Sequence, residues 1–209
     1  MPSRSRPTPP FRRTKAVVVV HDGKVIAERY AAGIGVDTPL LGFSMTKSVI
    51  NALIGILTQQ GLVTPSMPAP IPEWRGANDP RREIEVEHLM RMTTGLGARR
   101  NQLRLRSDRA RWSICTTTWP ASRSSAQMIA PPGTRWHYSS PTTQLLARII
   151  RDAVGGPEQT LAFAWRELFN PLGMRNVTLE FDGVGTLQGS TYMLASARDW
   201  AKIRPALSQ

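Results

Sequence analysis

Ser44 and Lys47 are the residues whose types and spacing most clearly allow chemistry. They stand at the start of a strongly helical pattern, and a separation of three residues places both on one face, a turn apart. A serine hydroxyl is a weak nucleophile until a neighbouring base takes its proton, and a desolvated lysine can serve as that base. The positive end of the helix would also favour negative charge on the oxygen. The alternative interpretation is a serine N-cap followed by a surface lysine.

Tyr138 and Ser140 form a second candidate group, between a Pro-Gly loop and the start of a later helix. A loop in such a position can present side chains to a cleft. A tyrosine phenol can act as a general acid or base where a nearby cation lowers its pKa. Ser140, followed by Pro141, would be the N-cap of the helix. Taken alone, the segment favours the alternative of a packed tyrosine beside a capping serine.

The elements that must position these residues alternate between short strands and helices. Two strand-like runs within residues 16–31 flank Asp22-Gly23, a typical two-residue turn, so we expect the chain to open with a β-hairpin. The first of them is apolar throughout, which is typical of a strand buried on both faces. Residues 44–60 have the apolar spacing of a helix that ends at Gly61. Further helices are expected at residues 84–92, 141–154, 157–169 and from 196 onwards.

Four segments, in a fixed order, carry a resemblance to a known family: residues 43–48, 88–96, 132–140 and 168–174. With the opening hairpin and residues 190–201, they resemble the serine β-lactamase-related superfamily, in its branch of class C-like serine hydrolases, esterases and 6-aminohexanoate-dimer hydrolases. The resemblance implies an α/β (α+β) fold of the β-lactamase/transpeptidase type, an antiparallel sheet with helices. It implies that Ser44 is the acylated nucleophile and Lys47 its proton acceptor. Tyr138 would relay protons to and from the leaving group, and Ser140 would be a substrate-binding residue at the third position of the Y-x-[SN] motif.

Two features depart from the pattern of that family. Residues 98–130 are arginine-rich and aperiodic where the family usually has an acidic, aromatic-containing segment, and a reading-frame shift that later reverts would produce such a stretch. The third motif of the family, K-T-G or H-x-G on a late strand, does not follow Tyr138. We therefore expect residues 16–209 to form a partial hydrolase domain that is incomplete at its C-terminus and impaired. Residues 1–15 are rich in Pro, Ser, Thr and Arg, and we expect them to be a disordered basic tail.

A net charge of +12 raises the alternative of nucleic-acid binding, but the excess charge is confined to two stretches. Residues 1–15 hold five basic residues and no acid, and residues 98–135 hold eight arginines and one acid. The rest of the chain is balanced, with 14 basic and 14 acidic residues. A nucleic-acid binder normally spreads basic residues along a folded face among aromatic ones, so this distribution argues against such a partner.

Cofactor, metal and membrane signals are weak in this sequence. One cysteine and three scattered histidines lack the spacing of metal ligands, and we expect no cofactor. No apolar run approaches the roughly 20 residues of a membrane span, and the apolar run after the basic N-terminus is too short for a signal-peptide core. These observations predict a cytoplasmic protein with no membrane partner.

The sequence therefore predicts acyl transfer from a small-molecule ester or amide to Ser44, followed by hydrolysis. The main alternative is a non-catalytic remnant of such an enzyme, and nucleic-acid binding is a weaker one. An unpaired apolar strand edge is a template for association. Self-association through the sheet edge at residues 16–31 is a further expectation.

Overall fold

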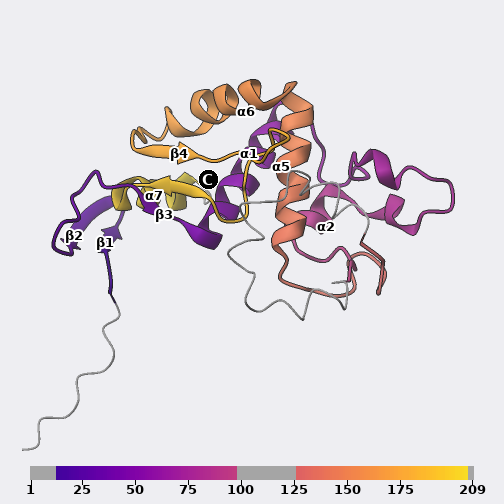
Figure 1. Cartoon of the computed structure of the whole chain (residues 1–209), viewed down its shortest axis with the longest axis horizontal. Helices are drawn as coiled ribbons and strands as arrows, with labels where there is room; N and C mark the ends of the chain where they lie inside the picture. The colour runs from indigo at the N-terminus through magenta and orange to yellow at the C-terminus, as the bar shows by residue number, and fades with distance from the viewer. Residues whose placement is uncertain (1–12, 98–125, 207–209) are drawn as a thin grey trace, which may run out of the picture.

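The computed structural model of the protein describes residues 13–97 and 126–206. A β-hairpin lies at one end of the longest axis, two long helices lie in the middle, and residues 62–85 reach toward the other end (Figure 1). Most of the expected tail at 1–15 and of the unusual stretch at 98–130 falls outside the described residues. Among the helices that the structure describes, none combines the length and the apolar character needed to cross a membrane.

The opening hairpin is formed as expected. β1 (Ala16–His21) and β2 (Lys24–Tyr30) pair in antiparallel register. Asp22 and Gly23 make the turn with φ angles of 47° and 73°. Positive φ at both central residues is what the tight turn of a twisted hairpin requires, and Asp-Gly is a pair that tolerates it.

The burial of β1 differs from the expectation of a strand covered on both faces. Half-buried and exposed side chains alternate along it, and Val17 and Val19 are 50% and 43% exposed. The strand packs against α7 (Ala197–Ala206), the last helix, so only its other alternate residues approach a neighbour. β1 therefore has the alternating exposure of a sheet with one open face.

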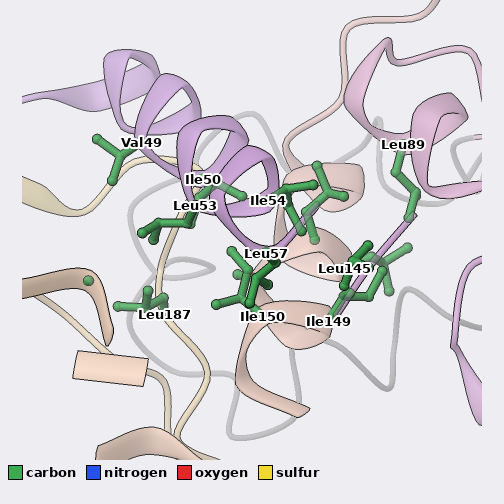
Figure 2. Packing of buried hydrophobic residues seen from close by; sticks show 14 of the residues in the cluster. Val49, Ile50, Leu53, Ile54, Leu57, Leu89, Leu145, Ile149, Ile150 and Leu187 are labelled. Atoms are coloured by element: carbon green, nitrogen blue, oxygen red, sulfur yellow. The ribbon is translucent and has the colours of Figure 1, made fainter. Parts of the chain in front are cut away.

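The core lies between helices that are far apart in the sequence. α1 (Thr46–Gln59) and α5 (Ser140–Val154) pack side by side, with the short α2 (Val86–Met90) against α5 (Figures 1 and 2). The positions on α1 that predicted a helix are the ones buried in this interface, namely Val49, Ile50, Leu53, Ile54 and Leu57. Their partners on α5 include Leu145, Ile149 and Ile150 (Figure 2). A stripe of this width is what drives such a helix into a core.

A second, three-stranded sheet lies between this core and the hairpin. Its order is β3 (Leu40–Leu41), β5 (Met193–Ala195) and β4 (Val177–Leu179), with both neighbouring pairs antiparallel. α6 (Pro157–Ala164) and the π-helical turn η5 (Trp165–Phe169) follow α5. The single helix expected at 157–169 is thus an α-helix that widens in its last turn.

Two helix starts differ from their prediction. The first helix begins with a 3₁₀ turn, η1 (Phe43–Met45), and becomes α-helical at Thr46. The expectation that Ser140 caps α5 is wrong, because Ser139 is the N-cap and its hydroxyl accepts a bond from the Thr142 N–H at 3.4 Å. Two adjacent serines before a proline made this choice ambiguous in the sequence. Two further short 3₁₀ turns, η2 (Pro72–Trp74) and η3 (Pro80–Glu83), precede α2.

Candidate active site

Ser44 lies in the 3₁₀ turn η1, directly before α1, with its side chain exposed. Phe43, directly before it, has a φ of 46°, which is uncommon for a bulky residue. Residues in such backbone conformations occur most often at functional sites. The turn is tied to the second sheet because the N–H of Gly42 donates to a β5 carbonyl at 2.9 Å. A Cβ atom on Gly42 would collide with the ring of Trp200, so only glycine allows the two to approach.

Lys47 is the second residue of α1, and its side chain is only 7% exposed. Its Nζ lies 3.3 Å from the Oγ of Ser44 and donates a 2.7 Å hydrogen bond to the carbonyl of Ser190. The alternative of a surface lysine does not describe this buried group. These two contacts hold the amine next to the hydroxyl of the exposed serine. A general base for that hydroxyl has to lie within this distance.

Tyr138 lies on the loop before α5, far in sequence from Ser44 and Lys47. The Nζ of Lys47 lies 5.2 Å from the centre of its ring, and the side chain is about half exposed at 49%. The pKa of the phenol is lowered from its ordinary value, chiefly by a side-chain hydrogen bond with Ser44 and further by the positive charge of Lys47, while burial opposes the shift. The phenol therefore gives up its proton more readily than a free tyrosine.

The loop that carries Tyr138 is held by the turn after α2. The His137 N–H donates to the carbonyl of Met92 at 2.9 Å, and the Ser139 N–H approaches the Sδ of the same residue at 3.5 Å. Met92 has a φ of 58°, which turns the chain sharply at this point. Ser139 then caps α5, so the phenol is fixed between a turn and a helix end.

Ser140 is the first residue of α5 and is half-buried. It lines a cavity of about 310 Å³ together with Tyr138, Leu96 and Leu145. Within the described part of the chain its hydroxyl makes no hydrogen bond to Ser44 or Lys47. The structure thus brings Ser44, Lys47 and Tyr138 together and places Ser140 in the adjoining cavity.

Residues that sequence reasoning missed support this group from behind. Gln144 on α5 is fully buried and binds the segment whose Ser190 carbonyl holds Lys47. The sequence feature that could have indicated Gln144 is its polar side chain on the apolar face of α5. Gly42 and its partner Trp200 are separated by most of the chain, and nothing local pairs them. In the described ranges 13–97 and 126–206, no cluster of three or more His, Cys, Asp or Glu side chains could hold a metal ion.

The arrangement is one that favours acyl transfer. An exposed hydroxyl is in contact with a buried amine, and a phenol with a loosened proton lies beside both. A nucleophile, a base within hydrogen-bond reach and a third group that can move a proton are the elements of covalent catalysis by serine.

The family model described as Beta-lactamase matches residues 12–208. The chain belongs to the beta-lactamase family. A comparison with curated proteins finds no match. The expected β-lactamase-like mixed α/β fold, with helices and antiparallel sheets, is confirmed.

Solved structures of similar fold come from several hydrolases. A protein described as a 6-aminohexanoate-dimer hydrolase from Bacillus anthracis is 23% identical, with a TM-score of 0.73 over 92% of this chain and 53% of its own. A D-alanine carboxypeptidase from Burkholderia cenocepacia is 18% identical, with a TM-score of 0.64 over 90% of this chain and 56% of its own. A D-amino acid amidase from Ochrobactrum anthropi is 19% identical, with a TM-score of 0.64 over 92% and 64%. This chain therefore spans between 53% and 64% of the length of these three proteins.

Proposed function

We propose that the chain is a serine hydrolase of the beta-lactamase type that transfers the acyl group of a small ester or amide to Ser44 and then to water. The observation that carries the proposal is the 3.3 Å contact between the Ser44 Oγ and the Nζ of buried Lys47. Solved structures of similar fold include a D-amino acid amidase and a 6-aminohexanoate-dimer hydrolase, which supports this substrate class. A cytoplasmic location stays a prediction.

In the proposed reaction Lys47 acts in its unprotonated form, after it has lost the positive charge that contributes to the lowered pKa of Tyr138. It takes the Ser44 proton while the Oγ attacks the carbonyl carbon of the substrate. The tetrahedral intermediate collapses, the C–O or C–N bond breaks, and Tyr138 passes the proton from Lys47 to the leaving group. Water then adds to the acyl-serine, the proton transfers run in reverse, and the carboxylic acid leaves with Ser44 restored.

A second candidate is a non-catalytic form of this hydrolase. It is favoured by residues 98–130, which lie between the segments that carry Lys47 and Tyr138. They are arginine-rich and aperiodic, whereas the family that these motifs resemble usually has an acidic, aromatic-containing segment there.

Covalent labelling with a fluorophosphonate probe separates the two candidates. We expect the probe to add to Ser44, because the contact with Lys47 makes its hydroxyl nucleophilic, and mass spectrometry to find no adduct in Ser44→Ala. Ser48→Ala, which removes a hydroxyl one turn along the same helix, is the matched control and should label normally. Lys47→Met should label about 10²–10⁴-fold more slowly, the usual contribution of a general base. Labelling that persists in Ser44→Ala would contradict the assignment, and an unlabelled wild-type chain would favour the non-catalytic form.

A further inference from the structure

Gln144 is a polar residue at the centre of the core. It lies on α5 between Thr143 and Leu145, and none of its surface is exposed. A buried amide is destabilising when its hydrogen bonds are left unmade, so the partners of Gln144 show which segment it holds in place.

Both ends of the Gln144 amide bind one segment of backbone. Its Oε1 accepts a hydrogen bond from the Ser190 N–H at 3.0 Å. Its Nε2 donates to the Leu187 carbonyl at 3.1 Å and to the Oε1 of Gln188 at 3.4 Å. The side chain therefore clamps residues 187–190, a segment 43 or more positions away in the sequence.

The same segment is pressed against α1 from the other side. A Cβ atom on Gly189 would collide with the side chain of Ile50, which lies one turn beyond Lys47. Ser190 follows directly and is 5% exposed. Its carbonyl is the 2.7 Å acceptor for the Nζ of Lys47. A continuous run of hydrogen bonds thus leads from Gln144 through Ser190 to Lys47 and from there to Ser44.

We propose that Gln144 is the positioning residue for the general base, because it fixes the Ser190 carbonyl that orients the Lys47 amine toward Ser44. This inference rests on the proposed function. A neutral amine has two N–H donors and one lone pair. When one N–H is committed to the Ser190 carbonyl, the rotation of the amine is restricted and its lone pair can meet the Ser44 proton. A carbonyl that drifts leaves Lys47 in contact range without the required orientation, and a small misplacement of this kind can cost about 10²-fold in rate.

Two variants of Gln144 test this role in the full chain. Gln144→Met keeps the length of the side chain and removes both the donor and the acceptor. We expect it to react with the fluorophosphonate probe about 10–10²-fold more slowly at Ser44. Gln144→Glu keeps the full geometry only while its carboxyl is protonated, since the acid can both accept from Ser190 and donate to Leu187. Its rate relative to wild type should therefore rise as the pH is lowered.

Thr160→Val is the matched control for loss of a buried hydrogen bond. Thr160 lies on α6, is fully buried, and donates to the Gly156 carbonyl at 2.7 Å. We expect Thr160→Val to lower the melting temperature to an extent similar to Gln144→Met, and to label Ser44 within about twofold of wild type. A purely structural role for Gln144 would make the two variants lose labelling together, in proportion to their stability.

Hydrogen exchange of the Ser190 amide tests the clamp without any activity. This N–H should exchange slowly in wild type and in Thr160→Val, and faster in Gln144→Met. If exchange quickens while labelling stays at the wild-type rate, the positioning role is overturned and the proposed function stands. If wild type itself is not labelled, the proposed function fails and the inference fails with it. Should Gln144→Met not melt cooperatively, the pH dependence of Gln144→Glu decides, and a flat ratio overturns the role.

Discussion

The two sides of Ser44 differ sharply in how they are packed. On one side, α1, which carries Lys47, packs against α5, and the helix residues that face each other are almost without exposed surface. On the other side, the hairpin, β3 and α7 border a groove of about 710 Å³ lined by apolar side chains such as Val18, Leu41 and Trp200. Phe43 and Met45, which flank the serine, are 63% and 52% exposed and line the same groove.

Because of this difference, the contacts that position Lys47 and the apolar surface beside Ser44 belong to separate parts of the molecule. The contacts that hold Lys47 come from the packed side, through Ser190 and the helix that carries the lysine. The groove side contributes apolar surface that stays in contact with water. Covering that surface would be favourable by about 25 cal/mol for each Å² of apolar area. We infer that the packed side, with α1 and α5, positions Lys47 and Ser44. We infer that the other side, with the hairpin and the groove and here called the open side, governs the association of the chain with a second copy.

The largest expected effect is on folding stability, from Leu53→Ala in α1. Leu53 has no exposed surface, so its truncation should lower the free energy of unfolding by about 2–5 kcal/mol. Val19→Ala is the matched change on the exposed face of β1 in the hairpin, and it should cost less than about 1 kcal/mol. Denaturant unfolding measures both. Equal losses at the two sites would show that the hairpin is as tightly packed as the helices.

The features that could be predicted from the sequence are those with a local cause. The apolar spacing of residues 44–60 indicated the buried face of α1, and Asp22-Gly23 indicated the hairpin turn with its positive φ angles. The separation of Ser44 and Lys47 indicated their contact, because helical geometry alone brings such a pair together. The fold class followed from the resemblance of four motifs to a known family, and the family model that matches residues 12–208 confirms it.

The features that could not be predicted depend on contacts between distant segments. Gln144 and Ser190 meet only when the segment after β4 folds back over α5, and no periodicity indicates that path. Gly42 is required by the ring of Trp200, which approaches it from the far end of the chain. The partial exposure of β1 depends on how much of the fold covers it, whereas its run of valines indicated only that it is a strand.

An intermediate effect is expected at Tyr138, whose ring lies near Lys47. The hydrogen bond with Ser44 is the main cause of the lowered pKa of its phenol, with a further contribution from Lys47. Removing that bond in Ser44→Ala should therefore raise the pH at which Tyr138 ionises, toward the ordinary range of tyrosine. The measurement is the ultraviolet difference absorbance between each chain and its Tyr138→Phe counterpart. An unchanged midpoint in Ser44→Ala would mean that Lys47 alone sets the ionisation.

The smallest effect on stability is expected from Val17→Lys in β1, and it tests what the open side does. Val17 is 50% exposed, so the change should alter the free energy of unfolding by no more than about 0.5 kcal/mol. In the described part of the chain the hairpin sheet has only two strands, so each has a free edge, and we propose that a second copy of the chain pairs there. A lysine on such a strand opposes this pairing through charge and hydration. Light scattering should therefore show association of the wild-type chain that weakens in Val17→Lys, while Leu161→Lys, at a 40% exposed site on α6, leaves it unchanged. A wild-type chain that stays monomeric across the concentration range would remove association from the open side and leave only the difference in packing.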